Sequence, residues 1–183
     1  MKQAFLLLGM AVIVLMTACE KSSAKPGSQT EIPESSPRTT VPAALQGNWM
    51  YGNFSMTEYW SQNPSTYIGN GFEFAVAFKF EANGIYTHYF TSKVVTLGVA
   101  TYHQSVTRGT VEVDAQTGKI TMHPVSARYK RSSLGVVEED RNLRKDEMTT
   151  GLYKFTSGKE PNGTNALYFL LQGTTTPLTF LQK

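Results

Sequence analysis

Apolar and polar residues alternate most regularly between residues 71 and 81, and this alternation predicts a β-strand. One face of the strand carries an apolar side chain at every second position, whereas the other face includes Glu73, Lys79 and Glu81. Antiparallel sheets commonly pack one face on the core, so we expect the apolar face to line the interior of the domain. Its members are Phe72, Phe74, Val76, Phe78 and Phe80.

The dipeptide Asn83-Gly84 follows this strand and predicts a tight hairpin turn, because both residue types tolerate a positive φ. A two-residue turn at this point would pair Phe80 with Thr87. The next pair on the same face would be Phe78 with Tyr89. Thr87 and Tyr89 are therefore expected in the interior, beside the phenylalanines. The outward-facing residues of the return strand would be Tyr86, His88 and Phe90.

The outward face of this predicted hairpin is also partly apolar, because Phe90 would lie across from Ala77. Apolar surface of this kind is usually covered by another part of the chain or by a partner. The sequence leaves two candidates for this cover: the segment around Tyr59-Trp60, or a partner chain.

Further strands follow at short intervals along the chain. A second hairpin is predicted where residues 110–114 and 119–123 flank a four-residue loop that ends in glycine. The run from 138 to 147 mixes acidic and basic side chains, which favours a solvated loop or a short surface helix. About eight strands joined by short turns predict an all-β domain, a single antiparallel up-and-down β-barrel. The other strands are expected near residues 45–52, 94–107, 151–157, 165–172 and 177–182.

The first residues of the chain have the pattern of an export signal. Met1-Lys2 supplies positive charge, and the apolar run from Ala4 to Leu15 is shorter than the roughly 20 residues that span a bilayer. The run ends in Leu15-Met16-Thr17-Ala18-Cys19, which resembles the bacterial lipobox. This resemblance implies that residues 1–18 are a lipoprotein signal peptide. It also implies a diacylglyceryl group on the Cys19 sulfur and an acyl group on its amine.

Residues 19–44 are rich in Ser, Thr and Pro and have no apolar periodicity, so we expect a disordered tether. The folded domain then occupies residues 45–183. Cys19 is the only cysteine, and a disulfide within the chain is therefore excluded. This organisation predicts a protein of the bacterial cell envelope, held at the outer membrane by its lipid and facing the periplasm or the cell surface.

The domain begins with Gly47-x-Trp49, an element that resembles the first-strand signature of the lipocalins. Further short elements resemble, in the same order, the lipocalin-like domains of small bacterial secreted proteins. The resemblance implies a lipocalin-like barrel in which Trp49 plugs one end. One departure is the last strand, which lacks the arginine that lipocalins place over this tryptophan. The further elements are Phe72-x-Phe74, Asn83-Gly84-x-Tyr86, residues 109–113, residues 119–121 and Thr179-Phe180.

The same resemblance implies that residues 53–70 form a long first loop over the open end of the barrel. Tyr59, Trp60 and Tyr67 make this loop a candidate lid over a ligand. The alternative is an ordinary Ω-loop, packed on the barrel by its own aromatic side chains.

Charge and residue spacing argue against several function classes. The formal net charge of +3 is small and dispersed, so we expect no nucleic-acid partner. The three histidines have no cysteine or paired carboxylate at ligand spacing, so we expect no metal site. Neither a nucleophile turn nor a phosphate-binding glycine loop is recognisable, and we expect no enzymatic activity and no cofactor.

Two functions fit these observations. The first is a membrane-tethered binding module that holds a small hydrophobic or amphipathic ligand inside its barrel. The second is a structural or protein-interaction module of the envelope, with a filled barrel and an envelope protein as partner. An eight-stranded barrel is just wide enough for side chains or one small ligand, so both stay open. The candidate ligand-facing residues are Trp49, Phe72, Phe74, Val76, Phe78, Phe80, Thr87 and Tyr89.

Overall fold

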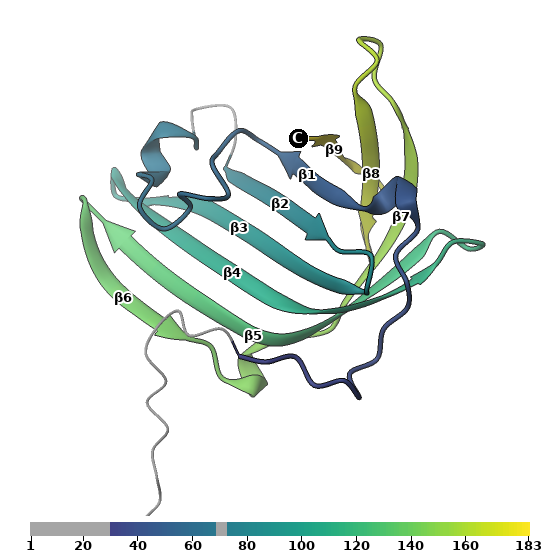
Figure 1. The fold of residues 1–183 in the computed structure, drawn as a ribbon. Helices are drawn as coiled ribbons and strands as arrows, with labels where there is room; N and C mark the ends of the chain where they lie inside the picture. Colours follow the sequence, from purple (N-terminus) through teal and green to yellow (C-terminus); the bar gives the residue numbers. More distant parts are fainter. Residues whose placement is uncertain (1–29, 69–72) are drawn as a thin grey trace, which may run out of the picture.

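The computed structural model describes residues 30–68 and 73–183, which form one strongly curved antiparallel sheet (Figure 1). Cys19 and Phe72 lie outside these ranges. Within them the helical segments are three single 3-10 turns, η1 (Ala43–Leu45), η2 (Pro64–Thr66) and η3 (Lys145–Glu147). None of these helices is long and apolar enough to cross a membrane. The strands are β1 (Gly47–Tyr51), β2 (Phe74–Phe80), β3 (Ile85–Thr96), β4 (Val99–Asp114), β5 (Lys119–Ser133), β6 (Val136–Asn142), β7 (Gly151–Lys159), β8 (Asn165–Leu171) and β9 (Leu178–Gln182).

Eight of the nine strands close into a ring. Strands β1 to β5 pair in chain order, β5 continues to β7, β8 and β9, and β9 returns to β1. The predicted antiparallel up-and-down barrel of about eight strands is therefore confirmed. Strand β6 lies outside the ring and pairs only with β5. It occupies residues 138–142 of the charged run that was expected to be a loop or a short helix, so that expectation is wrong for this half, whereas the other half contains the short helical turn η3.

Strand β5 pairs with a strand of the ring at its start and with β6, outside the ring, at its end, and a β-bulge bends it between the two. Its first residues pair with β7, whereas the residues from Arg128 onward pair with β6. Between them, Val125 is an extra residue opposite the step from Arg108 to Gly109. A side chain at Gly109 would collide with the backbone carbonyl of His123, so only glycine fits this close approach.

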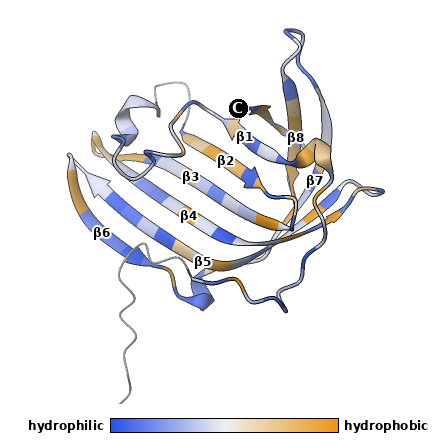
Figure 2. Ribbon diagram, in the orientation of Figure 1, coloured by the Kyte–Doolittle hydropathy of each residue, from blue (hydrophilic) through white to orange (hydrophobic). Residues whose placement is uncertain are grey.

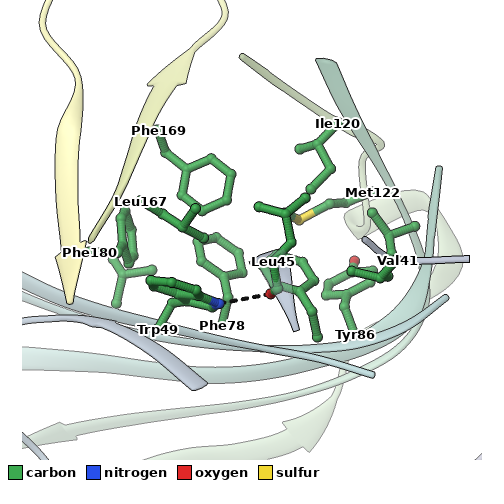
Figure 3. Packing of buried hydrophobic residues seen from close by; sticks show 13 residues of the cluster. Val41, Leu45, Trp49, Phe78, Tyr86, Ile120, Met122, Leu167, Phe169 and Phe180 are labelled. Carbon is green, nitrogen blue, oxygen red and sulfur yellow. Dashed lines mark hydrogen bonds between the residues drawn. The ribbon is translucent and has the colours of Figure 1, made fainter. Parts of the chain in front are cut away.

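The interior of the ring is filled by aromatic and aliphatic side chains from β1 to β5, β8 and β9, together with Val41 and Leu45, which precede β1 (Figure 3). Trp49 is only 2% exposed, and its indole Nε1 donates a hydrogen bond of 2.8 Å to the Leu45 carbonyl. The ring of Phe78 stacks on that of Phe80, with 5.6 Å between the ring centroids, and its centroid lies 5.3 Å from that of Phe180. Of the residues predicted for the interior, Trp49, Val76, Phe78 and Phe80 are buried there, and Phe74 is half-buried against them.

The predicted register of the β2–β3 hairpin is wrong by one residue. The observed partners are Phe80 with Tyr86 and Phe78 with His88. The loop has three residues, because the Glu81 N–H already donates to the Ile85 carbonyl at 2.9 Å. In this loop Gly84 alone adopts a positive φ, of 81°.

A register shift of one residue moves every side chain of the return strand to the opposite face. Thr87 and Tyr89 therefore lie on the outer face of the sheet, and both were wrongly predicted to face the interior. The inward residues are instead Tyr86, His88 and Phe90.

The outer face of β1 to β4 is covered by the chain's own loop between β1 and β2. Ala75 and Ala77 are fully buried beneath Tyr59 and Tyr67 in a second apolar cluster. The Tyr59 hydroxyl donates to the Phe90 carbonyl at 2.5 Å, which fixes the loop to β3. The loop is thus packed on the outer wall by its aromatic side chains, as the Ω-loop alternative describes, and does not cover the barrel end.

Candidate functional site

One end of the barrel interior is not filled and forms a cavity of about 470 Å³. It lies beside the bulge in β5, where Pro124 is part of its lining. Residues of five strands, β3, β4, β5, β7 and β8, line it together with Leu143 and residues 147–150 of the connection between β6 and β7. Its lining includes Tyr86, His88, Thr107, Met122, Tyr153 and Glu147.

The floor of the cavity is apolar and belongs to the buried core. Tyr86 and Met122 are both 3% exposed, and Tyr153 packs against the same cluster. Burial raises the pKa of Tyr86 above its usual value, and the nearby Tyr153 adds to this effect. The phenols therefore remain neutral at physiological pH, and the floor carries no charge.

His88 forms a neutral polar group on the wall of the cavity. Its ring stacks on Phe78, with 4.6 Å between the ring centroids and 13° between the ring planes. The loss of surrounding water lowers the pKa of His88 to about 4, because the charged form is poorly solvated there. At neutral pH the imidazole offers one donor and one acceptor without a charge.

Acidification should destabilise the fold through His88. Its pKa is about 4 in the folded chain against 6.5 ordinarily, so between these values the unfolded state binds more protons. The contribution of His88 to the free energy of unfolding is complete above pH 6.5. As the pH falls from 6.5 to 4, we expect a loss of at most about 3 kcal/mol, measured by urea unfolding at a series of pH values.

The variant His88→Phe keeps the stacked ring and removes the titrating nitrogen, so its stability should lose this pH dependence. His123→Gln is the matched control, because His123 lies near the surface in a pair with Glu112. If His88→Phe retained the full slope between pH 6.5 and 4, another group would be responsible.

The rim of the cavity is held in place by an ion pair. Arg141 donates from two nitrogens to the two carboxylate oxygens of Glu147, each at 2.8 Å. The backbone N–H of Arg144 donates to the same carboxylate at 2.7 Å. These hydrogen bonds, with that of Arg141 the strongest cause, lower the pKa of Glu147 to about 2. The connection is thereby fixed against β6, and the mouth of the cavity has a defined shape.

A second hollow, of about 610 Å³, lies on the outer wall beside the aromatic loop. Two of its cations are in ion pairs. The Arg128 guanidinium binds Asp140 at 2.6 and 2.8 Å and lies 4.5 Å from the centre of the Trp60 ring. Lys79 pairs with Glu81 at 3.2 Å. This hollow is a seam between the loop and the barrel, and the contact of Arg128 with Trp60 joins its two sides.

Of the eight residues predicted to face a ligand, the seven that the structure describes do not line the barrel cavity. The buried ones fill the other part of the interior, and Thr87 and Tyr89 line the outer hollow. Tyr86 and His88 were missed because the assumed two-residue turn put them on the outer face. A three-residue turn at Asn83-Gly84 would have placed both inside.

Comparisons with known proteins identify no relatives: no family model matches the chain, and no curated protein or solved structure matches it significantly. Within residues 30–68 and 73–183, no group of three or more His, Cys, Asp or Glu side chains could hold a metal ion.

Proposed function

We propose that this chain is a lipid-anchored protein of the bacterial cell envelope that holds a small amphipathic molecule in the end cavity of its barrel. The likeness of residues 15–19 to the lipobox supports the anchor, and the likeness of Gly47-x-Trp49 to the lipocalins supports a ligand-binding barrel. Cys19 carries the lipid in this proposal, and two or three acyl chains give firm attachment where one does not.

The observation that carries the binding proposal is the distribution of polarity in the cavity. Its lining combines the apolar, buried groups Tyr86, Met122 and Tyr153 with the polar side chains of His88 and Thr107 and with the hydroxyl-bearing residues 149 and 150 of the connection. A volume of about 470 Å³ falls within the roughly 300–1,000 Å³ typical of small-molecule sites. An amphipathic molecule would place its apolar part on the floor and its polar end beside His88 and Thr107.

The alternative role, protein interaction through a filled barrel, has less support. Its expected contact surface was the outer patch near Ala75, Ala77 and Phe90, with Trp60 beside it. Ala75 and Ala77 are buried under the chain's own loop, and Phe90 lies on the inner face. That patch is therefore already covered.

The test is native mass spectrometry of the lipidated protein purified from its own host. We expect a bound small molecule on the unaltered chain. The variant Thr107→Phe fills the cavity from the inner face of β4 and should lose at least about nine-tenths of the bound form, roughly 1.4 kcal/mol in affinity.

The matched control is Thr179→Phe, on the outer face of β9 and away from the cavities described above. It should retain the bound molecule. An unaltered chain free of any small molecule would favour the filled-barrel role, and equal retention by both variants would place the ligand elsewhere.

A further inference from the structure

Two neighbouring hairpins project apolar side chains into solvent at the same end of the sheet. The β3–β4 hairpin turns at Leu97-Gly98, and the β5–β6 hairpin turns at Leu134-Gly135. They lie next to each other because β4 pairs with β5, with Thr101 opposite Ser133. Figure 2 shows the apolar colouring at their ends. We call this surface the apolar tips; its exposed residues are Val94, Val95, Leu97, Val99, Leu134, Val136 and Val137.

The leucines at the summits of the two turns are held in an unfavourable backbone conformation. Leu97 and Leu134 each have a φ of 51°, and these are the two positive φ values among the described non-glycine residues. Asparagine or glycine normally occupies such turn positions, since a bulky side chain there costs roughly 1–3 kcal/mol. Leu97 is 100% exposed and Leu134 is 81% exposed, so neither gains compensating contacts within the described chain. The same costly choice at two adjacent turns indicates a contact outside the fold.

The backbone of the apolar tips is suited to an environment without water. Thr96 pairs with Val99, and Ser133 pairs with Val136, so each turn leaves only its two central residues outside the ladder. The ladder hydrogen bonds within each hairpin would therefore persist on leaving water, and the open outer edge of β6 would keep its backbone groups toward the hydrated headgroups. The sequence from Val94 to Thr107 also contains no Asp, Glu, Lys or Arg.

We propose that the apolar tips insert into the interfacial region of a lipid bilayer. The surface comprises seven exposed apolar residues, whereas a stable protein interface uses roughly 20–30 residues on each side, so a second copy is a poor occupant. A bilayer accepts narrow convex apolar tips without a complementary shape. Trp60 and the loop around it lie elsewhere, on the outer wall.

The length of the proposed tether allows a bilayer to reach the tips, because Thr30 lies in the outer hollow beside Arg128, which is six residues before Leu134 in the chain. The first described residue is Thr30, and the segment back to Cys19 spans at most roughly 40 Å at 3.3–3.6 Å per residue. This step rests on the proposed anchor, but it is independent of the ligand in the barrel. With both the lipid and the tips engaged, the barrel would have one fixed orientation on the membrane.

The test uses a fluorescent reporter on the full-length lipidated protein in phosphatidylethanolamine–phosphatidylglycerol vesicles. The diacylglyceryl group on the Cys19 sulfur blocks that thiol. Thr96→Cys therefore provides a single free thiol for a polarity-sensitive nitrobenzoxadiazole label beside Leu97. Gln116→Cys labels the β4–β5 turn at the opposite end of the sheet. We expect the emission of the label at 96 to shift to the blue and to be quenched by lipids with a nitroxide on the acyl chain, and the label at 116 to behave as in water.

The double substitution Leu97→Asn and Leu134→Asn, added to Thr96→Cys, separates membrane contact from folding. Asparagine suits the positive φ, so this variant should unfold at the same or a higher temperature and yet lose the blue shift and the quenching. A water-like label at 96 on vesicle-bound protein would overturn insertion, as would unchanged quenching in the double variant. A blue shift that depends on protein concentration and needs no vesicles would overturn it in favour of a second copy. Labelling of the unaltered chain would show a free Cys19 and contradict the anchor without bearing on the tips.

Discussion

Replacing Phe78 by alanine should lower the free energy of unfolding by about 3–5 kcal/mol, a large part of the 5–15 kcal/mol typical of a domain. The ring of Phe78 is 2% exposed and lies within about 6 Å of aromatic rings on five different strands. These strands lie on opposite sides of the barrel. The cavity that the substitution leaves therefore cannot close by a local shift of one strand. Unfolding in guanidinium, followed by tryptophan fluorescence, measures the loss. The neighbouring rings are Phe80, His88, Tyr153, Phe169 and Phe180.

Phe74→Ala is the matched control for this prediction, because Phe74 lies on the same face of β2 but is half-buried at its end. It stacks on Tyr51 at 5.2 Å and leaves part of its ring in water. We expect a loss of about 1–2 kcal/mol, since less apolar area returns to water. Equal losses for the two variants would mean that the interior around Phe78 is not the centre of the fold.

Replacing Cys19 by alanine should release the protein from the membrane fraction after washing. Each buried methylene of an acyl chain contributes about 0.8 kcal/mol, so removing two or three chains abolishes stable anchoring. The apolar tips alone would give reversible attachment that dilution removes. The measurement is flotation of washed membranes, with Ser23→Ala as the control in the same segment. A Cys19→Ala protein that floats with the membranes as completely as the unaltered chain would contradict lipid attachment at this residue.

The interior face of β2 could be predicted from the sequence because the alternation of apolar residues along a strand depends only on which face each side chain occupies. In residues 74–80 the period of two is unbroken, and the structure places Val76, Phe78 and Phe80 in the core. The register of the next strand depended instead on the length of the turn. Asn83-Gly84 suits two-residue and three-residue loops alike, since either loop needs a positive φ at its glycine. The error of one residue concealed Tyr86 and His88, and with them the cavity.

Strand β6 could not be recognised because its charges are paired across the sheet. Lys130 lies opposite Asp140, and Arg131 lies opposite Glu139, on the neighbouring strand. Complementary cross-strand charges stabilise a sheet without producing apolar alternation. In the sequence alone the same residues have the composition of a solvated loop.

The candidate site was the least predictable part of the molecule. Its lining comes from β3, β4, β5, β7 and β8 and from the connection after β6, which are distant from one another in the sequence. The sequence pattern within one segment does not predict which other segments it contacts in the folded domain. The cover of the outer face illustrates the same limit: the pattern showed that Ala77 needed a cover, and only the tertiary structure identified Tyr59 and its loop as that cover.

The position of β6 outside the ring has a consequence for self-association. A closed barrel exposes no strand edge, whereas β6 is paired on one side and leaves backbone donors and acceptors open to another chain. The consecutive charges Glu138, Glu139, Asp140 and Arg141 lie along this border. A second molecule adding its own β6 in an antiparallel register centred on residues 138–140 would place acidic side chains beside one another, which disfavours the pairing. The acidic side chains of β6 therefore oppose the edge-to-edge association of molecules that builds fibrils.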